Sequence, residues 1–143
     1  MKPLEKAKIK EIAEQFDCGF KCFWNLKNNE LIFIPDEDNG FSDMEFWQDE
    51  IDELENNFDE FVEIEKPTST DSFKMMEEFV ASDIPNKAFK IELSLSLTLK
   101  KSFRNFKYLI DNSSIRDLWF AFKSEQLQKW VETEIELIIQ QKN

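Results

Sequence analysis

Residues 91–99 alternate apolar and polar side chains without a break, which is the strongest two-residue period in the chain. The apolar members are Ile91, Leu93, Leu95, Leu97 and Leu99. A two-residue period is typical of a strand that buries one face. The segment also fits a helix, because Phe89, Leu93 and Leu97 recur at four-residue spacing. Taken by themselves, the residues slightly favour a strand.

The rest of the chain predicts an α+β fold, in which a small antiparallel three-stranded sheet with helices is followed by a C-terminal helical bundle. Alternation over residues 20–26 and 30–34, on either side of the turn residues Asn28 and Asn29, indicates a β-hairpin. Residues 61–65 supply a third strand that can pair with it. Apolar spacing of three and four residues predicts helices over Leu4–Phe16, after Thr68, over Ser102–Asp111 and from Ile115 to about Gln140.

A further helix is predicted to begin at Ser42, because Ser42 and Glu45 match a capping box. Its apolar stripe is expected to contain Phe46, Trp47, Ile51, Leu54 and Phe58. Its polar positions are acidic, since residues 36–65 hold 14 Asp and Glu and no Lys or Arg. The predicted acidic partner face consists of Asp43, Asp49, Glu50, Asp52 and Glu53. The plain alternative is a solvated helix face without a function.

Residues 1–143 are predicted to form one domain with two halves of opposite charge. Residues 1–84, the α+β half, hold 23 acidic and 8 basic side chains. Residues 85–143 form a basic-to-mixed helical half, in which residues 85–130 hold 9 basic and 4 acidic side chains. The net charge of −12 therefore conceals a polarised molecule.

The predicted helix over Ser102–Asp111 has a cluster of basic side chains at and before its start. Lys100, Arg104 and Lys107 follow helical spacing, and Lys101 lies beside them. A solvated amphipathic helix explains this layout without a function. The functional interpretation is a site for an anion or an acidic partner. Nucleic-acid binding is disfavoured, because the molecule as a whole repels phosphate at long range.

Several kinds of catalysis are excluded by composition. The chain has no His, so no Ser–His or Cys–His nucleophile pair exists. Its two glycines, Gly19 and Gly40, cannot form a glycine-rich phosphate loop. Cys18 and Cys22 are expected to be reduced thiols, and without further Cys or His they cannot complete a zinc site. The acidic run that begins at Asp36 does not match a calcium loop. No metal and no cofactor is therefore predicted.

Two blocks of sequence in the second half resemble a known family. They are Lys100-Lys-Ser-Phe-Arg-Asn-Phe-Lys-Tyr-Leu109 and Ile115-Arg-Asp-Leu-Trp-Phe-Ala-Phe122. Together with Met75-Met-Glu-Glu-Phe-Val80, they are similar to the signature of uncharacterised protein family 0158, a bacterial family. The resemblance implies a helix over residues 86–99 in place of the strand. It implies no activity, because the family has none established.

Four aromatic residues of these blocks recur at helical spacing. They are Phe103, Phe106, Trp119 and Phe122. Aromatic side chains at this spacing are most simply the core between the two helices that carry them. We therefore expect these residues to be structural.

The function predicted from these features is a non-catalytic cytoplasmic module for protein–protein interaction, with an unidentified protein partner. Self-association through the opposite charges is a related hypothesis. No membrane contact is predicted, because the charged N-terminus is not a signal peptide and no apolar run reaches the about 20 residues of a membrane span. Two alternatives stay open: a small carboxylate- or divalent-metal-dependent enzyme or regulator, and a nucleic-acid mimic or binder.

Overall fold

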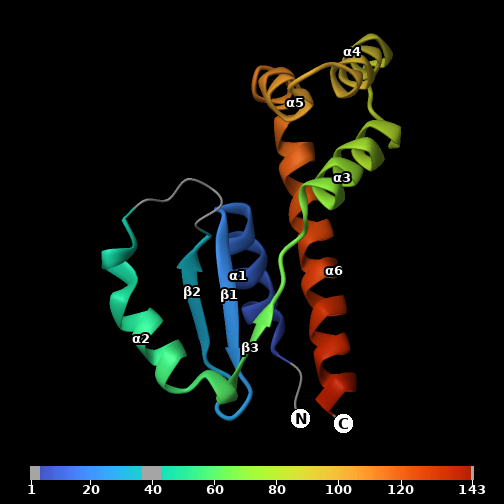
Figure 1. The fold of residues 1–143 in the computed structure, drawn as a ribbon. Helices are drawn as coiled ribbons and strands as arrows, with labels where there is room; N and C mark the ends of the chain where they lie inside the picture. Colours follow the sequence, from blue (N-terminus) through green and yellow to red (C-terminus); the bar gives the residue numbers. More distant parts are fainter. Residues whose placement is uncertain (1–3, 37–42, 143) are drawn as a thin grey trace. The chain divides into compact units, whose positions relative to one another are not determined.

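The computed structural model of the protein describes residues 4–36 and 43–142 (Figure 1). The chain forms two compact units, Met1–Lys66 with Leu127–Asn143, and Pro67–Gln126. The charge-based division at residue 84 does not coincide with these bounds. The physical reason is that the helix before residue 84 shares a core with the helices after it. The fold class is α+β, as the sequence predicts.

The first unit contains a three-stranded antiparallel sheet with the order β2-β1-β3. Its strands are β1 (Phe20–Asn25), β2 (Leu31–Pro35) and β3 (Phe61–Ile64). Cys22 of the central strand pairs with Phe33 on one side and Ile64 on the other. The hairpin turn is held by the Asn25 side chain, whose Oδ1 accepts hydrogen bonds from the backbone N–H groups of Lys27 and Asn28. The predicted hairpin and third strand are confirmed.

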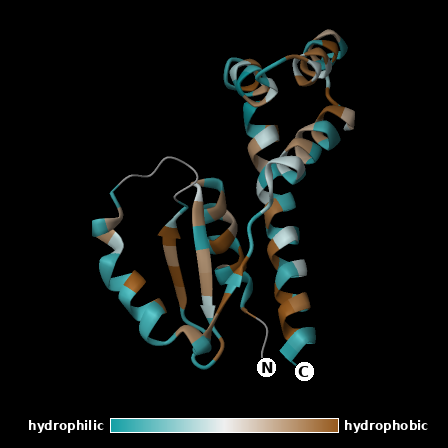
Figure 2. Cartoon of the chain, viewed as in Figure 1, coloured by the Kyte–Doolittle hydropathy of each residue, from teal (hydrophilic) through white to brown (hydrophobic). Residues whose placement is uncertain are grey.

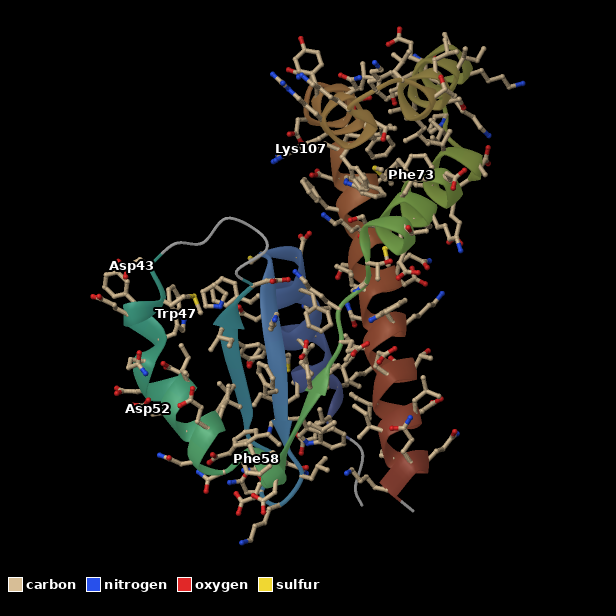
Figure 3. The ribbon with its side chains drawn as sticks, in the orientation of Figure 1. Asp43, Trp47, Asp52, Phe58, Phe73 and Lys107 are labelled. Carbon is tan, nitrogen blue, oxygen red and sulfur yellow. The ribbon has the colours of Figure 1, made fainter. Side chains whose placement is uncertain are left out.

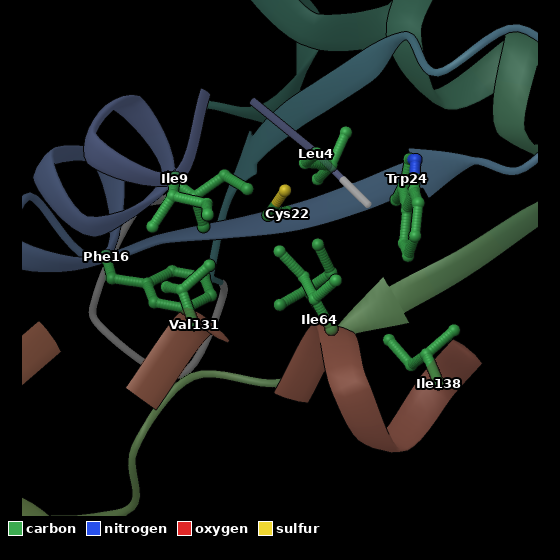
Figure 4. Close-up of a cluster of buried hydrophobic side chains, with 10 residues drawn as sticks. Leu4, Ile9, Phe16, Cys22, Trp24, Ile64, Val131 and Ile138 are labelled. Carbon is green, nitrogen blue, oxygen red and sulfur yellow. The ribbon is translucent and has the colours of Figure 1, made fainter. Parts of the chain in front are cut away.

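One core joins this sheet to two helices. They are α1 (Lys6–Asp17) and the C-terminal part of α6 (Arg116–Lys142). Figure 4 shows Cys22 and Trp24 of β1 beside Ile64 of β3 and Val131 of α6. The indole N–H of Trp130 donates a hydrogen bond to the Glu65 carbonyl at 2.8 Å, which ties α6 to the end of β3. Residues far apart in sequence therefore complete a single apolar core.

The acidic segment differs from the single helix that the sequence predicts. It consists of a 3₁₀ turn, η2 (Met44–Trp47), then α2 (Gln48–Asn56) and a second 3₁₀ turn, η3 (Phe58–Glu60). Ser42, the predicted cap, lies outside the described residues. A 3₁₀ turn advances about 120° per residue instead of about 100°, so the apolar spacing of a continuous helix is lost. As a result Phe46 is 79% exposed and Phe58 is 76% exposed, and the predicted stripe is wrong at both positions.

The second unit is helical and has its own core. It contains α3 (Ser69–Ala81), α4 (Lys87–Thr98), α5 (Ser102–Asp111) and the first part of α6. Thr68 caps α3 through a reciprocal capping box with Asp71, at the start of the helix predicted after Thr68. Trp119 lies at the centre, with its ring centroid 5.0 Å from that of Phe106 and 5.2 Å from that of Phe79. The helix over residues 86–99, which the family resemblance implies, is confirmed as α4, and the strand that its alternation favours is wrong.

Candidate functional site

Helix α4 carries apolar side chains on two opposite faces. Two residues along an α-helix correspond to a rotation of about 200°, so alternating leucines point alternately inward and outward. Leu93 is completely buried in the core of the second unit. The outward set, Ile91, Leu95 and Leu99, is between 59% and 62% exposed. Figure 2 shows brown, hydrophobic segments along α4 that reflect this composition.

The outward face of α4 forms one wall of a groove against α5. Seven residues line it: Glu92, Leu95, Ser96, Leu99, Asn105, Tyr108 and Leu109. Its volume is about 340 Å³. Tyr108 of α5 is itself exposed, and its ring extends the apolar surface of Leu95 and Leu99. The result is an open, mainly apolar groove with a few polar groups, within the second unit alone.

A tight turn between α4 and α5 sets the angle of the groove. Lys101, the residue before α5, has the left-handed backbone conformation, with φ of 58°. The Asn105 side chain donates a hydrogen bond to the Lys100 carbonyl at 3.0 Å, and the Asn105 backbone N–H donates to the Lys101 carbonyl at 3.0 Å. Left-handed conformation is costly for a residue with a Cβ atom. The two bonds offset this cost and hold the basic turn next to Leu99.

The four predicted basic site residues lie around this turn and along α5. Lys100, Lys101, Arg104 and Lys107 are all exposed. Arg104 and Tyr108 are four residues apart on α5, so they project from the same side of this helix, and Tyr108 lines the groove. None of the four forms an ion pair with any residue in 4–36 or 43–142. Lys100, Lys101 and Arg104 therefore form a basic rim beside the groove, whose lining holds the carboxylate of Glu92, whereas Lys107 lies on the side of α5 away from α4 (Figure 3).

The predicted acidic partner face belongs to the first unit. Asp43, Asp49, Asp52 and Glu53 are exposed, and Glu50 is half-buried. Asp52 accepts a hydrogen bond from the Gln48 amide at 2.8 Å. Figure 3 shows Asp43 and Asp52 at separate points along this helical segment, with Lys107 on α5. The structure places the acidic and basic site residues in different units.

The four motif aromatics are not equally buried. Phe106 and Trp119 are in the core of the second unit, and Phe122 packs half-buried against it. Phe103 is 45% exposed, so the expectation that it is core is wrong. It lies in the first turn of α5, where the ring of Phe73 makes an edge contact at 6.2 Å. A residue at a helix end has fewer neighbours than one at its centre, which explains the difference.

The sequence patterns do not indicate the apolar part of this site. Leu95, Leu99 and Tyr108 line the groove but were not among the predicted site residues. The available signal was the alternation itself, because a helix with alternating leucines must expose one of its two apolar faces. Exposure, not residue type, distinguishes Leu95 and Leu99 from the buried Leu93.

Two carboxylates with perturbed surroundings, Asp36 and Glu63, lie outside the groove. No group of three or more metal-ligating side chains lies within residues 4–36 and 43–142. Asp36, which opens the acidic run, is buried and forms an ion pair with Lys66, while the rest of that run up to Gly40 lies outside the described residues. Burial raises the pKa of the Glu63 carboxyl, but Glu63 lies on β3 and does not line the groove.

The chain folds as a small α+β protein, and its second unit carries an open, mainly apolar groove beside basic side chains. The chain belongs to the uncharacterised protein family UPF0158, whose family model matches residues 4–141. No curated protein and no solved structure matches the chain. No helix within the described residues is long and apolar enough to cross a membrane.

Proposed function

We propose that the protein is a non-catalytic protein–protein interaction module, and that the α4–α5 groove binds an acidic, apolar segment of a protein. The observation that carries the proposal is the outward face of α4, where Leu95 and Leu99 are exposed beside Tyr108. Contiguous exposed apolar surface that is rimmed by polar groups is typical of interaction sites. A shallow groove between two helices is also a common seat for an amphipathic helix.

The positive charge of the rim indicates that the partner segment is acidic. The rim residues Lys100, Lys101 and Arg104 lie outside any described ion pair, so their charges are available to a ligand. Exposed charges at the edge of an interface contribute most to selection and to the rate of association. Apolar side chains of the partner would fill the groove, while its carboxylates would face the rim. We propose a bacterial, cytoplasmic setting, which the family resemblance and the free thiols of Cys18 and Cys22 support.

A labelled model peptide tests this proposal. The probe is a synthetic amphipathic helix with Leu and Phe on one face and Glu on the other, and its binding is followed by fluorescence anisotropy. We expect Leu95→Asp to weaken binding at least about tenfold, because it places a charge in the apolar groove. Leu118→Asp is the matched control, since Leu118 is 53% exposed on α6 and does not line the groove. A peptide with Lys in place of Glu should not bind.

Two results would overturn the proposal. One is equal binding of the acidic and basic peptides, or unchanged binding by Leu95→Asp. The other is displacement of the acidic peptide by a single-stranded oligonucleotide at lower concentration than by unlabelled peptide. That second result would assign the basic rim to nucleic acid instead of protein.

A further inference from the structure

We infer that the occupant of the groove is a second copy of this chain, which inserts Phe46 and its flanking carboxylates. This inference rests on the proposed function, because it names the partner of the same groove. The chain itself has an exposed apolar side chain next to carboxylates, which is the combination proposed for the ligand of the groove. Phe46 is the most exposed large apolar residue of the described chain, at 79%. Its neighbours Asp43, Glu45 and Asp49 are exposed as well.

The position of Phe46 suits it to act as an anchor. It lies in the 3₁₀ turn η2, and its ring meets that of Trp47 edge-on at 6.2 Å. Trp47 in turn contacts the ring of Phe20 on β1 at 5.8 Å. Phe46 therefore stands next to a residue that contacts the sheet, while most of its own side chain is in solvent. Figure 3 shows Trp47 at the start of this helical segment. A pre-positioned aromatic side chain loses little conformational freedom when it binds, which favours it as an interface anchor.

Charge determines which two surfaces meet. Two identical grooves facing each other would bring two basic rims together, and like charges oppose such a symmetric pair. The acidic segment has the opposite character, because residues 43–60 contain nine carboxylates and no Lys or Arg. These residues are Asp43, Glu45, Asp49, Glu50, Asp52, Glu53, Glu55, Asp59 and Glu60. Phe46 of one copy is therefore expected to meet the groove of another copy, with carboxylates against the rim.

Such a contact is head-to-tail, because the two surfaces that meet are different. Each added copy leaves one free groove and one free Phe46 segment at the ends of the assembly. Contacts of this kind produce closed rings or open chains instead of a simple two-fold dimer. This property also makes the contact separable by mutation, since each surface can be removed without touching the other.

Two complementary variants test the inference by sedimentation velocity. Leu95→Asp is expected to disable binding by the groove and leaves Phe46 unchanged. Phe46→Ser removes the anchor side chain and leaves the groove unchanged. We expect the unmodified chain to form species larger than a monomer as its concentration rises. Each variant alone should stay monomeric, and an equimolar mixture of the two should give a one-to-one dimer. Because both substituted side chains are exposed, neither change is expected to unfold the chain.

Matched controls keep the outcomes distinct. Phe58→Ser controls for Phe46, because Phe58 is exposed to a similar extent in the same acidic segment, and Leu118→Asp controls for Leu95. The controls should assemble like the unmodified chain. A monomeric unmodified chain at all concentrations, or a mixture that stays monomeric, would overturn the inference. If the acidic model peptide still binds the groove in that case, the proposed function stands and only the choice of a second copy is wrong.

Discussion

Cys22 and Cys18 differ at the scale of single residues, although only three residues separate them. Cys22 is buried in the core of the first unit, and this burial raises the pKa of its thiol, with smaller contributions from the charges of Glu11 and Glu63. Cys18 is exposed. Because the thiolate is the reactive form, a buried thiol of raised pKa reacts slowly near neutral pH. The labelling rate of Cys22 therefore depends on whether the core is intact, whereas Cys18 is accessible at the surface.

We predict that a thiol reagent labels one cysteine in the folded protein and both in denaturant. Mass spectrometry should place the first label on Cys18. Cys18→Ser should abolish fast labelling, whereas Cys22→Ser should leave it unchanged. Rapid labelling of Cys22 in the folded state would contradict the packing of β1 against α1 and α6.

Among the elements, α4 is the one in which a helix and a strand would place the leucines most differently. In a strand Leu93 and Leu95 would share one face, but in α4 they lie on opposite faces. Leu93→Ala is expected to lower the free energy of unfolding by about 2–5 kcal/mol, because it leaves a cavity. Leu95→Ala should change it by no more than about 0.5 kcal/mol, since Leu95 is exposed. Urea unfolding measures both, and equal losses would contradict the helix.

The N-terminus of α3 gives a prediction about pH. Hydrogen bonds from the Thr68 side chain and backbone lower the pKa of the Asp71 carboxyl below its ordinary value of 3.8. A carboxyl whose pKa is lower in the folded state than in the unfolded state stabilises the fold at pH values above the unfolded-state pKa. This contribution is lost as the pH falls through the folded-state pKa. The stability difference between the unmodified chain and Asp71→Asn should therefore shrink below about pH 4.

Thermal unfolding across this range of pH provides the measurement. The same substitution in a Thr68→Ala background supplies the control, because the hydroxyl that lowers the pKa is then absent. Its pH dependence should be weaker than in the unmodified background. A stability difference that grows as the pH falls would contradict the capping arrangement at Thr68 and Asp71.

The elements also show how far the sequence predicts this fold. The sheet and α3 follow from local signals, because alternation, turn residues and the Thr68 cap all act over a few positions. The interpretation of α4 needed the family resemblance, since alternating leucines fit both a strand and a helix with two apolar faces. The prediction of one continuous helix for the acidic segment is wrong, because nothing in its sequence distinguishes such a helix from a shorter helix with 3₁₀ turns at both ends. The basic rim was predictable from charge, whereas the groove beside it required the tertiary packing of α4 on α5.

At the scale of the whole molecule, charge acts on stability and on association in opposite directions. The net charge is −12, and the nine carboxylates of residues 43–60 repel one another in the folded chain. Salt screens this repulsion and should stabilise the fold. The same screening weakens attraction between a basic rim and acidic residues on another molecule. Salt therefore separates the two effects in one protein.

We predict that raising NaCl from about 0.05 M to about 0.5 M increases the unfolding temperature, because the Debye length falls from about 14 Å to about 4 Å. The measurement uses the Leu95→Asp variant, because its groove is expected not to bind and self-association then does not contribute to the unfolding temperature. Replacing Asp49, Asp52 and Glu53 by their amides should reduce the response to salt. A lower unfolding temperature at high salt would show that attraction, not repulsion, dominates the folded charges.

The outward face of α4 is the surface that we propose binds a protein. The most direct test follows leucine methyl signals by NMR while the acidic model peptide is added to Phe46→Ser, in which the groove is intact and free. We predict that the signals of Leu95 and Leu99 shift with the peptide while that of buried Leu93 stays close to its free position. Shifts confined to residues outside the groove, such as Leu118, or no shift at Leu95 and Leu99, would contradict protein binding at this face.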